Sequence, residues 1–156
     1  MNESMMPQQI SSDRPVKLFW GAVLQGRLHR WWAALTRRCD CLTDLDQLLE
    51  KSPIQSSHYA GLKAVKINNI HGTQGKGEDF DGEFYPITER TRSRWLAIVL
   101  EKLRGHELPP VELIEVENVY YVRDGHHRIS VSRTLGQEFI DAEVTVVMLS
   151  KPLNLL

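Results

Sequence analysis

The chain has 156 residues, of which 42% are hydrophobic and 25% charged, a composition typical of a folded globular protein rather than a disordered one. Its net charge of −1 gives the molecule as a whole no electrostatic preference for nucleic acid or membranes. No segment reaches the roughly 20 apolar residues that span a bilayer, and the N-terminus lacks the order of a signal peptide, so we expect a cytoplasmic protein.

Residues 1–60 are predicted to form a polar tail and a helical extension. A helix is expected to begin just after Pro15, because apolar side chains then recur at steps of three and four. This stripe consists of Phe19, Val23, Leu24, Leu28, Trp31 and Leu35. A second, short helix is expected at residues 43–49, with Thr43 as its N-cap. The two cysteines, Cys39 and Cys41, have no further metal ligands nearby, which predicts free thiols.

Charge is unevenly distributed over this first part. Residues 14–38 hold six Lys or Arg and no acid, whereas residues 40–50 hold four acids and no Lys or Arg. Tryptophans interleaved with basic residues can bind nucleic acid or lie at a membrane surface. For nucleic acid, the candidate contacts are Arg27, Arg30, Arg37 and Arg38. Packing of the helix on its own domain is the commoner arrangement and is the one we expect.

Residues 61–150 are predicted to form an α/β (α+β) unit, a small mixed sheet with packed helices. Alternating polar and apolar residues predict strands at 63–70, 111–116, 119–122 and 140–148, the middle two as a hairpin turning at residues 117–118. A helix is expected from an N-cap at Thr88 to Gly105, and a short one from His126 to Leu135. The irregular, glycine-rich stretch 72–86 is long enough to indicate a functional loop.

The turn Asp124-Gly125-His126-His127-Arg128 carries the strongest chemical signal. It leads from a strand into a helix, whose first N–H groups and dipole attract anions. Gly125 lets a phosphate approach the backbone, both histidines can donate hydrogen bonds, and Arg128 offers a charged fork that suits phosphate oxygens. Asp124 is a candidate helix cap, ribose ligand or magnesium ligand. Capping alone, without a ligand, is the alternative.

The run of residues 120–136, followed by 140–144, resembles the ParB/sulfiredoxin superfamily. The upstream order agrees: a strand at 65–70, a helix ending at Gly105, and Leu108-Pro109-Pro110-Val111 leading into the hairpin. The resemblance covers about residues 63–148 and leaves residues 1–60 unexplained. It implies that the turn holds nucleotide phosphates, those of ATP in sulfiredoxin and of CTP in ParB. The Asp-Gly-His-His-Arg turn is similar to that of free-serine kinases, which transfer a phosphoryl group to a small hydroxyl substrate.

Two departures from these families narrow the expected function. Sulfiredoxin has its catalytic cysteine where His126 stands, so the nucleophile for its reaction is missing. A chromosome-partitioning ParB continues into a helix-turn-helix module, for which residues 149–156 would leave no room, and its turn commonly has Arg where this chain has His127. We therefore expect neither activity.

The loop after the first strand is the second candidate element. Its spacing around Lys76 does not match a P-loop, since Gly72 precedes the Gly-Lys pair by too few residues. The serine-kinase resemblance implies a catalytic carboxylate in this region, and Glu78 and Asp79 are our candidates, with Lys76 near the phosphates. Asp81 and Asp124 are candidate magnesium ligands, and Glu83 completes the acidic cluster. A solvated acidic loop is the alternative.

A basic run at the start of the next expected helix, Arg90, Arg92 and Arg94, lies at two-residue intervals and so points in several directions. A solvated face is the expected role, although Arg92 or Arg94 could reach the phosphate pocket. Our leading interpretation is a ParB-like nucleotide-binding domain that takes a nucleoside di- or triphosphate with magnesium. The alternative is a nucleotide-dependent small-molecule phosphotransferase, and a DNA-binding protein or nuclease ranks below both. The sequence leaves nucleotide identity, turnover and oligomeric state open.

Overall fold

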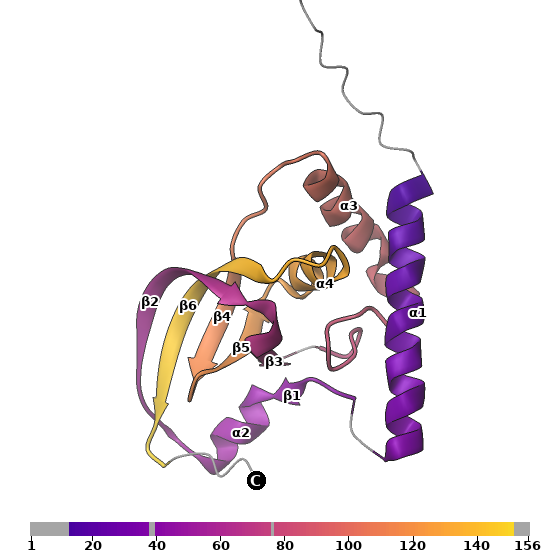
Figure 1. Ribbon diagram of the computed structural model, residues 1–156. Helices are drawn as coiled ribbons and strands as arrows, with labels where there is room; N and C mark the ends of the chain where they lie inside the picture. Colours follow the sequence, from indigo (N-terminus) through magenta and orange to yellow (C-terminus); the bar gives the residue numbers. More distant parts are fainter. Residues whose placement is uncertain (1–12, 38–39, 76, 152–156) are drawn as a thin grey trace, which may run out of the picture.

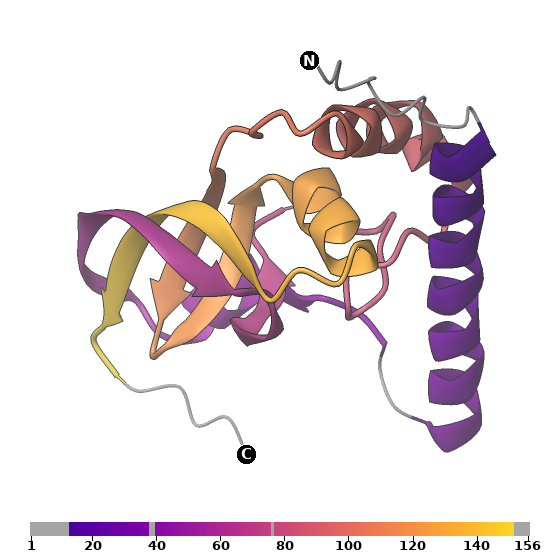
Figure 2. The same cartoon turned by 45° about the horizontal axis from the view of Figure 1, so that its top comes forward.

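The computed structural model describes residues 13–37, 40–75 and 77–151. In chain order its elements are α1 (Asp13–Thr36), β1 (Thr43–Asp44), α2 (Leu45–Lys51), β2 (Ile54–Lys66), η1 (Ile67–Asn69), β3 (Ile70–Thr73), η2 (Glu89–Thr91), α3 (Arg92–Leu103), β4 (Val111–Val116), β5 (Val119–Asp124), α4 (His126–Thr134) and β6 (Phe139–Leu149). Figures 1 and 2 show a twisted sheet on one side and helices stacked away from it, ending in the long α1.

Six strands of the described residues form one mixed sheet in the order β1-β3-β5-β4-β6-β2. The parallel pairs are β1 with β3, β3 with β5 and β4 with β6, while β4 with β5 and β6 with β2 are antiparallel. Glu117 and Asn118, both with positive φ (51° and 65°), make the tight turn of the β4–β5 hairpin. The α/β class, the mixed sheet and the hairpin expected from the sequence are confirmed.

Strand β4 divides the core between the two faces of the sheet. Val111 and Leu113 join the cluster that contains Ile129 of α4, so α4 covers that face. Ile114 and Val116 join the cluster of Leu45, so α2 covers the other. The alternation of a strand thus places two helices on opposite sides of one sheet.

A second layer of helices lies outside α4. Phe19 and Val23 of α1 pack against Trp95 and Val99 of α3, and Val131 of α4 completes the same cluster. The buried Trp95 indole donates a hydrogen bond to Ser130 Oγ at 3.0 Å, which joins α3 to α4. The helix that leads the chain is therefore anchored to the helix that follows the candidate turn.

Strand β2 begins nine residues earlier than expected, at Ile54 rather than residue 63, and pairs along its length with β6. The expected division between residues 60 and 61 falls inside this strand. Its first half carries no polar–apolar alternation because this edge strand exposes both faces to solvent. The end of the expected strand 63–70 is instead η1 and the first residue of β3.

Helix α1 begins at Asp13, with Pro15 in its first turn, where a missing N–H disrupts no hydrogen bond. The expected loose tail therefore does not reach Pro15, and residues 1–12 lie outside the described part of the chain. Within the predicted apolar stripe, Phe19 and Val23 are buried, but the packing expectation is wrong for the other four members, which are exposed: Leu24, Leu28, Trp31 and Leu35. Successive residues of a helix are rotated by about 100°, so the six members of the stripe spread over more of the helix circumference than one packing contact covers.

Three local expectations also need correction. The N-cap of α2 is Asp44, whose Oδ1 accepts from the Asp46 N–H at 2.9 Å, whereas Thr43 pairs with Gly72 in the sheet. Thr88 caps η2 only by position, because its hydroxyl donates to Asp79 instead. Cys41 is disulfide-bonded rather than a free thiol, and Cys39 lies outside the described residues.

Candidate functional site

The turn between β5 and α4 is built around Gly125. This residue has φ 110°, and a Cβ added there would lie 2.5 Å from Val111 Cγ1, so both conformation and space require glycine. No side chain caps the helix that follows, which leaves the N–H groups of its first turn for another acceptor. The sequence prediction of a tight turn that leads into a helix is confirmed.

A pocket of about 220 Å³, here named the turn pocket, opens at this helix start. It is lined by Asp79, Phe80, Arg94, Ile98, Asp124, Gly125, His126, His127 and Arg128. All five residues of the predicted turn therefore line one cavity, together with one of the two candidate carboxylates. Three chain segments far apart in sequence meet here.

Arg128 forms part of the pocket wall but is already engaged. Its Nη1 donates to the carbonyl oxygens of Pro109 (2.9 Å) and Pro110 (2.6 Å), and its Nη2 donates to Asp124 Oδ2. The guanidinium therefore fastens the segment before β4 to the turn before α4. Its expected role as an open fork for phosphate is corrected: most of its donors are used within the protein.

The two histidines of the turn are predominantly neutral groups. Burial, and then the neighbouring His127, lower the pKa of His126 from 6.5 to about 4, and burial with the charge of Arg94 also lowers that of His127. His126 Nε2 lies 2.7 Å from Thr73 Oγ1, and its ring stacks on Phe80. His126 is thus held in place and can offer a ligand one neutral ring nitrogen.

Asp79 enters the pocket as a prepared carboxylate. Its Oδ1 accepts from Thr88 Oγ1 at 2.7 Å and from Arg90 Nη2 at 2.8 Å, while Oδ2 takes no hydrogen bond from the described residues. Burial raises its pKa, but the bonds from Thr88 and Arg90 and the charges of Arg90 and His127 outweigh it, so the pKa is lowered overall. Asp79 is therefore ionised at neutral pH with one oxygen available.

Arg94 is the cation of the pocket that is not already bound. It lies on the first turn of α3, is exposed, and forms no hydrogen bond or ion pair with any described residue. Arg90 is paired with Asp79, and Arg92 lies over the ring of Trp20 at 5.9 Å. Sequence spacing could not single out Arg94 from Arg90 and Arg92, because the packing of α3 on α4 decides which arginine faces the turn.

Other predicted site residues lie elsewhere. Glu78 lines a separate pocket of about 380 Å³, on the far side of Phe80, together with Asp40 and Arg30. Asp81 is fully buried, and its carboxylate accepts from His29 at 2.9 Å and from backbone N–H groups.

Asp81 therefore shapes the loop and does not face the turn pocket, which argues against the magnesium role expected for it. Asp124 does face the pocket, although one of its oxygens is paired with Arg128. Glu83 lies 3.6 Å from Arg133. Lys76 lies outside the described residues. Among the described residues, no group of three or more His, Cys, Asp or Glu is arranged to hold a metal ion.

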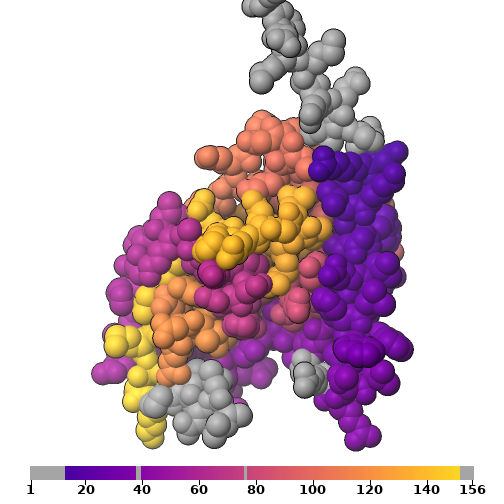
Figure 3. Space-filling model, viewed as in Figure 1, coloured from indigo at the N-terminus to yellow at the C-terminus, as the bar shows by residue number. Residues whose placement is uncertain are grey.

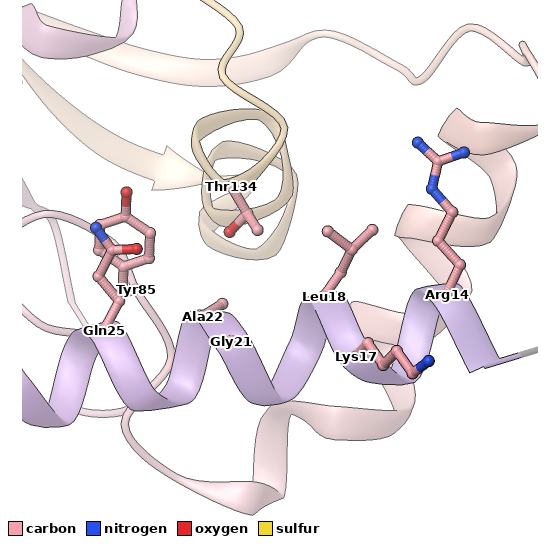
Figure 4. A pocket seen from close by; sticks show the side chains of 8 residues that line it. All are labelled: Arg14, Lys17, Leu18, Gly21, Ala22, Gln25, Tyr85 and Thr134. Carbon is pink, nitrogen blue, oxygen red and sulfur yellow. The ribbon is translucent and has the colours of Figure 1, made fainter.

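Two larger grooves were not foreseen from the sequence. One, of about 540 Å³, continues from the turn pocket and shares Arg94, Ile98, Asp124 and Arg128 with it. Its other walls are Ala97, Leu108, Pro109, Pro110, Glu112 and Glu143. The other, of about 550 Å³, lies between α1 and α4 and is lined by Arg14, Lys17, Leu18, Gly21, Ala22, Gln25, Tyr85 and Thr134 (Figure 4). Both join segments distant in sequence, and no local pattern marks them.

The nucleic-acid candidates Arg27, Arg30 and Arg37 are exposed on α1 or directly after it, and Arg38 lies outside the described residues. None of the three lines the turn pocket. Within the described part of the chain, no helix combines the length and apolar character that crossing a bilayer requires.

Comparison of the sequence with protein-family models and with curated proteins gives no match. Among solved structures, the fold is similar to that of sulfiredoxin from Arabidopsis thaliana, with a TM-score of 0.40 and 16% sequence identity. The similarity covers 56% of this chain and 86% of that one. The similarity concerns the arrangement of the chain and shows neither a ligand nor a reaction.

Proposed function

We propose that the turn pocket binds the phosphates of a nucleoside di- or triphosphate. The observation that carries the proposal is the unpaired guanidinium of Arg94 on the same cavity as the uncapped helix start at 125–128. A charged donor and a set of backbone N–H groups together suit phosphate oxygens, which accept several hydrogen bonds at once. The neutral ring of His127 can add one donor without adding charge.

The adjoining groove suits the nucleoside. It begins at Arg94 and Asp124, where the phosphates would end, and continues between α3 and the 108–110 segment. Leu108, Pro109 and Ala97 give it apolar walls, as ligand pockets commonly have, against which a flat base can pack. Asp124 lies at the junction, where a ribose hydroxyl would pass.

Magnesium is expected to accompany the nucleotide. Mg²⁺ is commonly held by one or two carboxylates together with substrate phosphates, and Asp79 and Asp124 are the carboxylates on the pocket. Of the two, Asp124 is the one we assign to magnesium, and the oxygen of Asp79 that accepts no hydrogen bond is left for a substrate. The cytoplasmic location and the part played by Lys76 stay predictions.

A thermal-shift series with ATP, ADP, CTP and GTP, each with magnesium, tests the proposal. At a ligand concentration of about 100 times Kd, the melting temperature should rise by roughly 5–10 °C for the preferred nucleotide. Arg94→Ala should weaken binding about tenfold to a hundredfold, because a charge-assisted contact is lost. Arg92→Ala is the matched control, since it removes the same charge from the same turn of α3 outside the pocket.

Two results would refute this assignment. One is the absence of any nucleotide-dependent rise in the wild type. The other is an Arg94→Ala variant that responds to nucleotide as fully as Arg92→Ala does. Arg128→Ala is a poor probe here, because it would also release the segment at Pro109 and Pro110.

A small-molecule phosphotransferase is the second candidate, favoured by the position of Asp79 on the turn pocket. In that reaction a substrate hydroxyl oxygen would form a bond to the terminal phosphorus, and the bond from that phosphorus to the bridging oxygen would break. The proton would pass to Asp79 Oδ2, and the shortened nucleotide would leave with the bridging oxygen. Nuclease activity and DNA binding have no comparable support from the turn pocket.

A further inference from the structure

Helix α1 presents a second apolar face, opposite the one that anchors it. Large side chains on the outer side are widely exposed: Leu24 60%, Leu28 54%, Trp31 62% and Leu35 63%. We name these four residues the outer strip. At 1.5 Å per residue, it extends about 16 Å from position 24 to position 35. Exposed apolar rows of this kind mark interaction surfaces.

The outer strip is held rigidly and faces away from the protein. The opposite side of α1 is fixed by Phe19, Ala22 and Val23, which are at most 2% exposed within the helix cluster. Both ribbon views and the space-filling view show α1 along one edge of the molecule, with no other described element outside it (Figures 1–3). The strip is therefore a ridge available to a large, flat partner.

Charge identifies the kind of partner. After Asp13, its first residue, α1 contains four Lys or Arg and no acid, and Arg27 is exposed at the edge of the strip without an ion-pair partner among the described residues. Arg30 lies on the loop side of the helix, where it lines the pocket of Glu78. Pairing with α1 of a second copy would bring arginines together with no carboxylate between them. The partner must therefore supply negative charge next to an apolar layer.

We propose that α1 lies flat on an anionic lipid surface, with the outer strip in the acyl boundary and Arg27 at the headgroups. An interfacial helix has this arrangement, an apolar face beside a basic one. Tryptophan suits the boundary, since its ring is apolar and its N–H stays near water; Trp32 lies next to the strip and is 61% exposed. Duplex DNA would use the arginines alone and leave the leucines exposed.

Flotation with unilamellar vesicles tests the proposal on the full chain. The wild type should float with phosphatidylcholine–phosphatidylserine vesicles and much less with phosphatidylcholine alone, and the binding should weaken as salt rises. Three of the four tryptophans are on α1, so their emission should shift to shorter wavelength on binding. Arg27→Gln should reduce the preference for anionic vesicles.

The variant Leu28→Gln/Trp31→Gln/Leu35→Gln should lose vesicle binding by roughly tenfold or more. Its control is Tyr59→Gln/Leu62→Gln/Met148→Gln, which removes three similarly exposed apolar residues from the sheet side and should bind as the wild type does. All altered positions are exposed, so the melting temperature should stay near that of the wild type.

Four outcomes would overturn the proposal. The first is a wild type that does not float with anionic vesicles, and the second is an α1 variant that floats as well as the control. The third is a wild-type dimer that the α1 variant converts to a monomer without vesicle binding. The fourth is binding of duplex DNA through Arg27 and Arg30 with no effect of the strip. The nucleotide assay on the α1 variant is independent, because the strip does not line the turn pocket.

Discussion

His126 Nε2 lies 2.7 Å from Thr73 Oγ1, and this contact joins the first residue of α4 to the last residue of β3. The Thr73 hydroxyl also lies 3.3 Å from the carbonyl oxygen of Val122 in the adjacent strand. The imidazole, stacked on Phe80, is therefore part of the packing of the turn as well as of its pocket. Its protonation should then affect the stability of the fold.

Lowering the pH should destabilise the protein through His126. The unfolded residue takes up a proton near pH 6.5, but the folded residue does so only near pH 4, so the folded state is disfavoured as pH falls between these values. Above pH 6.5 the contribution is complete, and its loss corresponds to about 3 kcal/mol. Chemical denaturation at several pH values should show this decrease, and a flatter profile in His126→Gln. Equal slopes in both proteins would contradict it.

Replacing Gly125 should be far more damaging than replacing another glycine of similar backbone conformation. Gly125→Ala combines φ 110° with a Cβ only 2.5 Å from Val111 Cγ1, and Val111 is fully buried. Gly136→Ala is the control, because its φ is 72° but nothing lies within 4 Å of the added atom. We expect a loss of about 1 kcal/mol at Gly136 and about 2–4 kcal/mol at Gly125, measured by urea denaturation. Similar losses would show that the turn can shift away from β4.

The hairpin, α4 and the turn between them could be predicted because their signals are local. Alternation sets β4 and β5, residues 117–118 form a two-residue turn, and Gly125 stands directly before the helix. Such patterns depend on a few neighbouring residues, so the structures they predict do not change when the chain packs. The sequence also predicts that α1 is a helix. It does not predict which side of α1 packs on the domain, because periodicity indicates an apolar stripe but not what covers it.

The remaining features of the site depend on contacts between distant segments. Arg128 is engaged by carbonyl oxygens 18 and 19 residues before it, which no spacing rule anticipates. Glu78 and Asp79 are adjacent in sequence, yet they line different pockets because Thr88 and Arg90 hold Asp79. Arg94 stands out from Arg90 and Arg92 only once α3 is packed.

Removing the Arg128 side chain should destabilise the fold itself, in addition to any loss of contacts with a nucleotide. Arg128→Ala would leave the carbonyl oxygens of Pro109 and Pro110 and the carboxylate of Asp124 without their shared donor. We expect a loss of about 2–4 kcal/mol in the free energy of unfolding without ligand, and little recovery in Arg128→Lys, which lacks the planar fork. Arg94→Ala, at an exposed and unpaired position, should stay within about 0.5 kcal/mol of the wild type. An Arg128→Ala protein as stable as Arg94→Ala would show that the contacts are not stabilising.

Asp79→Asn separates nucleotide binding from turnover. If the protein transfers phosphate, the amide can neither accept the substrate proton nor carry charge, so turnover should fall by about a hundredfold or more, while the nucleotide-dependent rise in melting temperature is largely retained. Glu78→Gln is the matched control, since the neighbouring carboxylate lines the other pocket and its loss should leave turnover intact. Release of the shortened nucleotide in the presence of serine and other small hydroxyl compounds is the measurement. Turnover that depends on Glu78 and not on Asp79 would place the reaction on the far side of Phe80, where Asp40 and Arg30 would be its neighbours.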